Sequence, residues 1–127
     1  MKRMVTVTPE EIAQYRSELS ADSGALAALD VAEDCEGDLE DAAIALALKA
    51  GQEPDQSDRW LEGFAKRWRA YICQSGFRQG VGTGAIAKGV QLLAAEMAIP
   101  SGLATLVLIY IHKTGVDNFC KPLEEKL

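Results

Sequence analysis

Apolar side chains recur along most of this chain at intervals of three and four residues, the spacing that places them on one face of an α-helix. The clearest case lies within residues 57–74, where the apolar positions are Trp60, Leu61, Phe64, Trp68, Tyr71 and Ile72. No segment shows a competing strand pattern of comparable length, because Val5–Val7 is short. The pattern predicts an all-α protein.

Capping residues and glycines divide this pattern into separate helices. Thr8, Pro9 and Glu11 form a helix-start signature, since threonine caps, proline suits the first turn and glutamate can bond back to the cap. Further starts are expected at Asp22 or Ser23, Asp38, Ser57 or Asp58, Ala85 and Ser101, and ends at Leu19, Gly37, Gly51 and Gly115. Residues 51–57 are predicted to be a loop, and the glycine-rich residues 74–84 a joint.

An uncharged stretch of fifteen residues, 97–111, is the most apolar part of the chain. A membrane-spanning helix needs about 20 apolar residues, and Pro100, Ser101 and Gly102 interrupt this one. A helix that is apolar on all sides is typically surrounded by other helices, so residues 103–111 are predicted to form a central core helix. A membrane hairpin and a pocket lining are the alternatives. Over residues 106–111 the pattern alone does not separate a buried helix from a buried strand.

The length of 127 residues and the hydrophobic content of 48% fit one domain with its own core. We expect a single bundle of five or six helices around the central apolar C-terminal helix. Within the domain 1–127 we distinguish an acidic helical half (9–55), a basic and apolar half (57–121) and a frayed tail (122–127). A last helical turn is expected at 117–120, before Pro122.

Charge is distributed unevenly along the chain. Residues 9–58 contain fourteen Asp and Glu against two Lys and Arg, whereas residues 59–88 contain six Lys and Arg against one Glu. The formal net charge of −6 argues against a nucleic-acid partner, which requires a basic surface. Complementary acidic and basic surfaces instead favour a protein partner or self-association.

The three cysteines, Cys35, Cys73 and Cys120, lie far apart and form no CxxC motif. An odd, scattered set is typical of buried thiols in a reducing cytoplasm and not of a disulfide framework. The N-terminus carries no secretory signal pattern. A cytoplasmic location is therefore expected.

The densest acidic stretch, Ala32–Ala42, suggests one enzyme hypothesis. Its spacing does not fit a calcium-binding EF-hand, because glycine and the final glutamate are out of register. A magnesium site for a phosphohydrolase remains an alternative, with the candidate ligands Glu33, Glu36, Asp38 and Asp41. Hard cations need several oxygen ligands, and the downstream carboxylates that could complete the site are isolated.

A second alternative is a pocket for an apolar small molecule. Its candidate lining consists of Trp60, Phe64, Trp68 and Tyr110. Both tryptophans fall on the apolar side of their helix, so the competing interpretation is that these rings belong to the core.

Three segments, TPEEIAQYRSEL, EDCEGDLEDAAIALALKAGQEPD and ATLVLIYIHKTGVDNFCKPL, together resemble a family of small, uncharacterised helical proteins of cyanobacteria. The resemblance covers nearly the whole chain and implies a bacterial, cytoplasmic protein. It implies no activity and no site residues.

These patterns contain no catalytic constellation, and we expect no catalytic residues and no cofactor. The function that the sequence favours is a non-enzymatic cytoplasmic interaction or regulatory module that self-associates. The magnesium-dependent phosphohydrolase and the apolar small-molecule binder are the alternatives.

Overall fold

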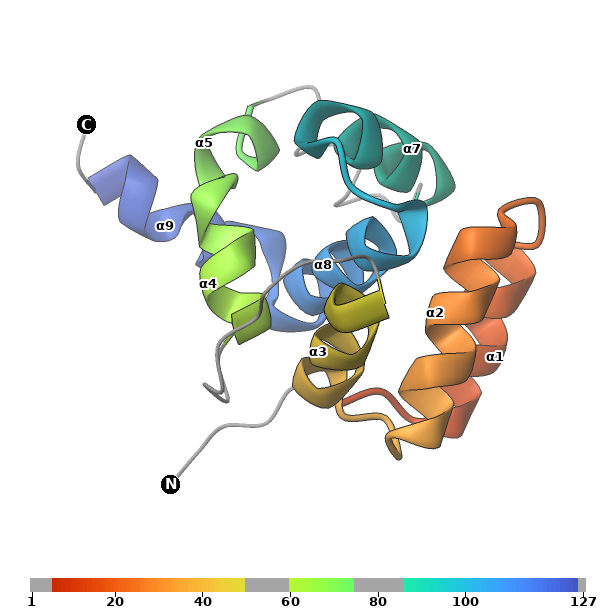
Figure 1. Ribbon diagram of the computed structural model, residues 1–127. Coiled ribbons are helices and arrows are strands. Elements are labelled where there is room, and N and C mark those ends of the chain that lie inside the picture. Colours follow the sequence, from red (N-terminus) through yellow and green to blue (C-terminus); the bar gives the residue numbers. More distant parts are fainter. Residues whose placement is uncertain (1–5, 50–59, 75–85, 126–127) are drawn as a thin grey trace.

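The described part of the chain is helical. A computed structural model describes residues 6–49, 60–74 and 86–125 (Figure 1), and within these ranges the only strand-type pairing is a single antiparallel bridge between Thr6 and Asp38. The predicted all-α class is confirmed. The helices are α1 (Pro9–Glu18), α2 (Ser23–Asp34), α3 (Leu39–Lys49), α4 (Trp60–Arg67), α5 (Arg69–Ile72), α7 (Ile86–Met97), α8 (Ser101–Thr114) and α9 (Val116–Glu125).

Within the described ranges there are eight helices, so the expected number of five or six is wrong. One reason is that the helix expected over residues 57–74 breaks at Trp68. The Trp68 amide donates to Ala65 O, three residues back, at 3.1 Å, and its backbone leaves the helical region at φ −108° and ψ 14°. Apolar periodicity cannot reveal this break, because the same residues remain on the apolar side across it.

The other reason is α9, which extends through Pro122 to Glu125, whereas a single turn and a frayed tail were expected there. Phe119 and Cys120 are buried and anchor the turn before the proline. The expected loop at 51–57, the helix start at Ser57 or Asp58 and most of the glycine-rich joint lie outside the described residues.

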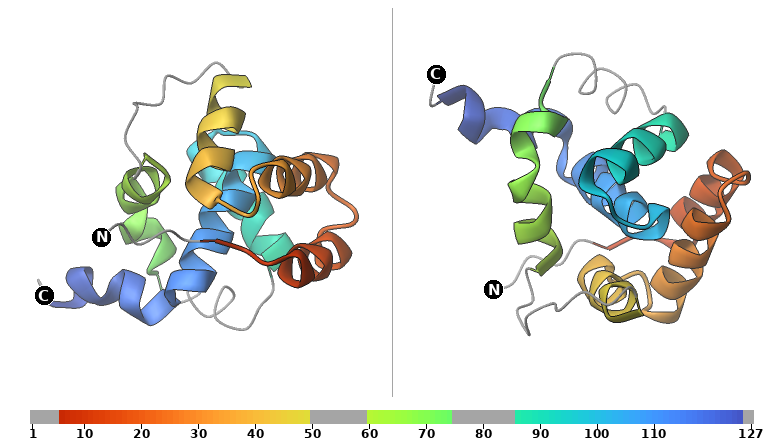
Figure 2. Two further views of the ribbon diagram at one scale, coloured as in Figure 1. Left: turned by 90° about the horizontal axis from the view of Figure 1, so that it is seen from below. Right: turned by 45° about the horizontal axis from the view of Figure 1, so that its top comes forward.

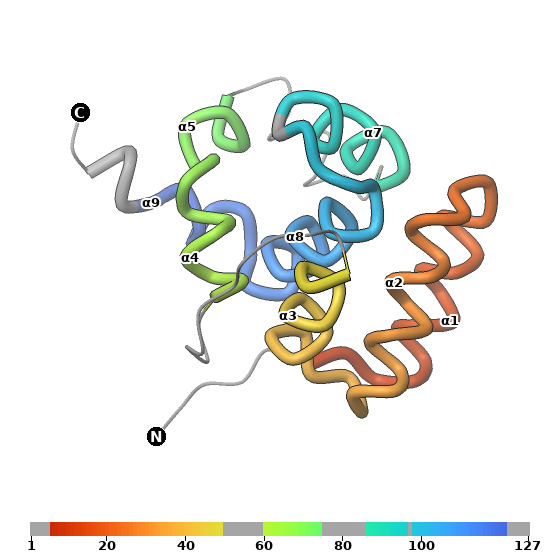
Figure 3. Tube along the Cα trace, viewed as in Figure 1, coloured from red at the N-terminus to blue at the C-terminus, as the bar shows by residue number. Residues whose placement is uncertain are grey.

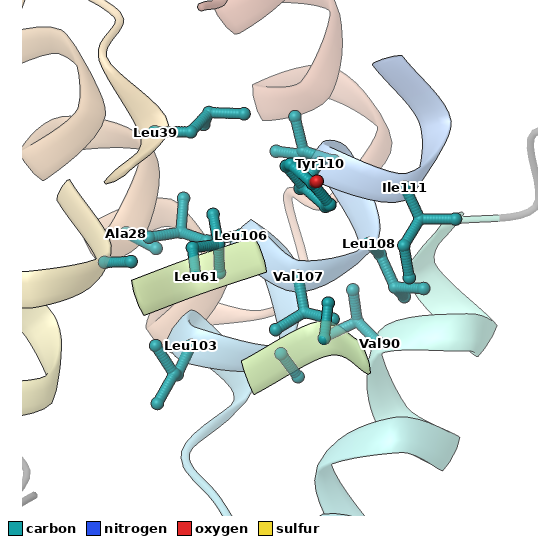
Figure 4. Close-up of a cluster of buried hydrophobic side chains, with 14 of the residues drawn as sticks. Ala28, Leu39, Leu61, Val90, Leu103, Leu106, Val107, Leu108, Tyr110 and Ile111 are labelled. Carbon is teal, nitrogen blue, oxygen red and sulfur yellow. The ribbon is translucent and has the colours of Figure 1, made fainter. Parts of the chain in front are cut away.

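α8 is the most deeply buried helix of the described part. Every residue from Gly102 to Ile111 is buried, and α8 contacts α2, α3, α4, α7 and α9. Figure 4 shows side chains of four of these helices around it, namely Ala28 from α2, Leu39 from α3, Leu61 from α4 and Val90 from α7. Burial of each large apolar side chain in this way contributes about 1.5–3 kcal/mol to the free energy of folding. Residues 106–111 are thus helical and not a strand.

α7 packs along α8, and the other helices form two groups beside this pair. α1 and α2 make an antiparallel hairpin on one side, and α3 follows across the bundle, as the tube in Figure 3 traces. α4 and α5 lie on the opposite side, and α9 leaves the bundle next to α5, as both views in Figure 2 show. None of the helices in the described ranges is long and apolar enough to cross a bilayer.

Hydrogen bonds confirm three of the expected helix starts, at Thr8, Asp22 and Asp38. Thr8 Oγ1 accepts from the Glu11 amide at 3.1 Å, and Glu11 Oε1 accepts from the Thr8 amide at 2.9 Å, which completes the predicted capping box. Asp38 Oδ1 accepts from the Glu40 amide at 3.0 Å. Gly115 ends α8 with a φ of 97°, a conformation that glycine adopts without a steric penalty.

The expected cap at Ser101 is wrong. Ser101 is the first residue inside α8, and its hydroxyl donates to Asp22 Oδ1 at 2.8 Å. The same Asp22 oxygen accepts from the Ala25 amide at 3.0 Å, so Asp22 caps α2 as predicted. One carboxylate oxygen therefore joins the N-terminal ends of α2 and α8.

Candidate functional site

The turn between α2 and α3 carries four exposed carboxylates, and we call residues Glu33–Asp41 the acidic turn. Glu33, Asp34, Glu36 and Asp41 are exposed there. The Gly37 amide donates to Ala32 O at 2.8 Å and the Glu36 amide to Glu33 O at 3.0 Å, which is the bonding of a Schellman helix end. The backbone beneath these carboxylates is therefore fixed by hydrogen bonds.

Gly37 holds the acidic turn against the N-terminal segment. Its φ is 84°, and a Cβ placed there would lie 2.1 Å from the Val7 carbonyl oxygen. The Val7 amide donates to Gly37 O at 2.9 Å, and Val7 itself is buried. Only glycine fits this position, for both conformational and steric reasons.

The four carboxylates proposed as magnesium ligands have different surroundings. Glu33 Oε2 accepts from Arg16 Nη2 at 3.4 Å, and Asp38 caps α3 through its bonds to the amides of Glu40 and Asp41. Glu36 lies in the left-handed region at φ 57°. Across residues 6–49, 60–74 and 86–125, no three His, Cys, Asp or Glu side chains are arranged to hold a metal ion. The magnesium site remains a prediction from the sequence.

The four rings proposed to line a pocket pack in or beside the core. Phe64 and Tyr110 are each 7% exposed, and Trp60 and Trp68 are partly buried against the core. The ring centroids of Trp60 and Phe64 are 5.0 Å apart, and the Arg67 guanidinium lies 5.8 Å from the Phe64 centroid. These contacts are with other protein groups, and the apolar ligand remains a prediction.

Glu40 is a structural site that the sequence analysis did not single out. From α3 its carboxylate reaches the start of α4, where Oε1 accepts from the Leu61 amide at 2.6 Å and Oε2 from the Glu62 amide at 3.1 Å. Burial raises the pKa of Glu40, and the two amide bonds oppose that rise. The partners are 21 and 22 residues away in sequence, so no local signal could have identified this contact.

The cysteine prediction is wrong for two of the three residues. Cys73, just after α5, and Cys120, in α9, form a disulfide, while Cys35 is a free, partly buried thiol. The burial of Cys35, together with the negative charges of Asp41, Asp38 and Asp34, raises its pKa. The 47-residue separation of the paired cysteines hides the pairing from spacing rules, which depend on short motifs.

The chain was compared with protein-family models, with curated proteins and with solved structures, and none of them matches it.

Proposed function

We propose that the chain is a non-enzymatic interaction module and that its acidic turn docks on a basic surface of a second copy. The observation that carries this proposal is the exposure of Asp34, Glu36 and Asp41 on a backbone already fixed by the helix-end bonds described above. Charges on an ordered support lose little conformational entropy when a partner binds.

A basic surface of the matching kind is present on α4. Lys66 and Arg67 are exposed there. The Lys66 side chain is 49% exposed and pairs with Glu62 at 3.0 Å within the helix, so a partner's carboxylates would compete for a cation that still faces solvent. Charge complementarity of this type contributes mainly to association rate and specificity.

Sedimentation equilibrium of the purified protein across salt concentrations tests the proposal. Screening shortens the range of charge interactions from about 30 Å at 0.01 M salt to about 3 Å at 1 M, so we expect dimers at low salt that dissociate as salt rises. A monomer at every salt and protein concentration would overturn the proposal.

A matched pair of double variants locates the surface. Asp34→Asn combined with Glu36→Gln removes two charges from the acidic turn and should weaken the dimer. Glu10→Gln combined with Glu18→Gln removes the same number of charges from exposed positions on α1 and should weaken it much less. Equal effects of the two pairs would indicate a general influence of net charge and would contradict the assigned surface.

A further inference from the structure

One side of α7 packs on the bundle and the other side faces solvent. Gly89, Val90 and Leu93 are buried, and α7 packs against α8. In Figure 1, α7 lies at the upper edge of the bundle. The exposed residues between 86 and 96 are Ala87, Lys88, Gln91, Leu92, Ala95 and Glu96. We call these six residues the outer face of α7.

Leu92 is the large apolar side chain of the outer face. It is 45% exposed, and only one other large apolar side chain of the described residues is as open to solvent. Ala95 lies three residues further along and is also exposed, so it falls on the same side of the helix. Its side chain is a single methyl group, which lets a second helix approach this face closely.

Two opposite charges lie at equal distances on either side of Leu92. Lys88 comes four residues before it and Glu96 four residues after it, which is about 6 Å along the axis in each direction. In an antiparallel second copy of α7 with Leu92 opposite Leu92, Glu96 of that copy comes level with Lys88. The second Lys88 then comes level with Glu96, so both pairs carry opposite charges. A parallel copy in the same register would instead place like charges side by side.

We propose that the outer face of α7 docks a second copy of the chain, with the two α7 helices antiparallel and Leu92 at the two-fold axis. The contact is isologous, because both copies use the same face. A helix of twelve residues offers a small area beside the roughly 800 Å² per partner of a stable complex. The contact is therefore weak and forms in concentrated protein. It uses neither the acidic turn nor α4, and it does not rest on the proposed function.

The test uses the full chain with the acidic-turn contact weakened. Asp34→Asn with Glu36→Gln removes charges from the acidic turn, and Cys35→Ser removes the thiol that lies outside the disulfide. We call this protein the background variant. The proposed function is tested by comparing the acidic-turn charges, whereas the α7 contact is tested by changes on α7 alone. Failure of one proposal is thus distinguishable from failure of the other.

Charge reversal on α7 tests the antiparallel register. In sedimentation velocity of the concentrated background variant at low salt, we expect a dimer. Lys88→Glu alone and Glu96→Lys alone each place like charges level with one another and should abolish it. An equimolar mixture of these two proteins restores both opposite-charge pairs, so it should contain at least tenfold more dimer than either protein alone.

A second pair of charge reversals is the matched control. Lys49→Glu and Glu10→Lys produce the same two net charges at exposed positions outside α7. Each of these proteins should keep the dimer of the background variant, and mixing them should add none. All four reversals are at exposed positions, and circular dichroism verifies that each protein is folded.

A cysteine at the proposed axis tests the position of the contact. Leu92→Cys brings the thiols of two copies together, where copper(II) phenanthroline accepts two electrons, two protons leave and an intermolecular disulfide forms. Ala13→Cys, at an exposed position on α1, reports the rate of random collisions. We expect cross-linking of Leu92→Cys to be at least tenfold faster.

Each of three results would overturn the proposal. The first is a background variant that stays monomeric at the highest attainable concentration. The second is a mixture of Lys88→Glu and Glu96→Lys that contains no more dimer than either protein alone, or gains no more than the control mixture does. The third is cross-linking of Leu92→Cys at the rate of Ala13→Cys, which would exclude a second copy as the occupant of the outer face.

Discussion

α2 and α8 approach each other closely at Gly102, and the absence of a side chain on this residue allows the contact. A Cβ at Gly102 would lie 2.8 Å from Gly24 O and 3.3 Å from the Ala28 Cβ, so the two helices could not keep their separation. We predict that Gly102→Ala lowers the free energy of unfolding by about 1–3 kcal/mol, the usual cost of overpacking. Urea denaturation measures this change.

Gly63, on an exposed part of α4, is the matched control. A Cβ there would meet nothing within 4 Å, and alanine has the higher helix propensity. Gly63→Ala should therefore raise the free energy of unfolding by about 0.5–1 kcal/mol. If both substitutions have the same sign, the close approach of α2 and α8 is not as described.

The raised pKa of Glu40 leads to a prediction about how the stability of the protein depends on pH. Because its pKa is raised in the folded protein, the folded state favours the protonated carboxyl, and ionisation lowers stability as pH rises from the ordinary value of 4.5 through the raised pKa. Glu40→Gln cannot ionise. The stability of the unsubstituted protein relative to this variant should therefore fall as pH rises across that window.

Chemical denaturation at a series of pH values measures that difference. Glu18→Gln, which replaces an exposed carboxyl on α1, serves as the control. If the stability of the unsubstituted protein relative to Glu40→Gln rises with pH, or does not change, Glu40 is not a desolvated carboxyl at the start of α4.

At the scale of elements, α1 and α8 are joined by an ion pair. Lys113 Nζ donates to both carboxylate oxygens of Glu11 at 2.8 Å, and this bond, followed by the bond from the Thr8 amide, lowers the pKa of Glu11. The stabilisation is complete above the ordinary value of 4.5 and is lost as pH falls through the lowered pKa.

Lys113→Gln should therefore reduce stability at neutral pH by less than about 1 kcal/mol, since the pair is partly exposed and screened by solvent. The variant should also lose less stability on acidification than the unsubstituted protein does. Lys88→Gln, at an exposed position on α7, is the control. Thermal melts at pH 7 and pH 3.5 compare the three proteins, and identical acid sensitivity would exclude a role for the pair.

The sequence predicted the features that depend on neighbouring residues. The capping box at Thr8, the caps at Asp22 and Asp38 and the end of α8 at Gly115 all involve groups within a few positions of one another. Contacts between distant segments were not predictable in this way. Glu40 bonding to the start of α4, Ser101 bonding to Asp22 and Cys73 pairing with Cys120 arise only when the folded helices bring those residues together.

The candidate sites were less predictable than the fold. Acidic composition identified the acidic turn but did not show that Asp38 is occupied as a cap or that Glu33 faces Arg16. Arg16 also bonds to Asp30, so part of the negative charge of the acidic half is neutralised within the α1–α2 hairpin. The negative charge counted from the sequence of the acidic half is therefore larger than the negative charge that is available to a partner.

In the whole molecule, we expect the chain's own helices to shield α8 from solvent, since residues 102–111 are buried. Native-state hydrogen exchange of the oxidised protein across a series of low urea concentrations measures this protection. If α8 is enclosed, amides 103–111 exchange only by global unfolding, and their free energy of opening equals the free energy of unfolding from urea denaturation. If these amides instead exchange with a free energy of opening well below the free energy of unfolding, and with little dependence on urea, they open by a local fluctuation. That result would contradict the enclosure of α8 by the other helices.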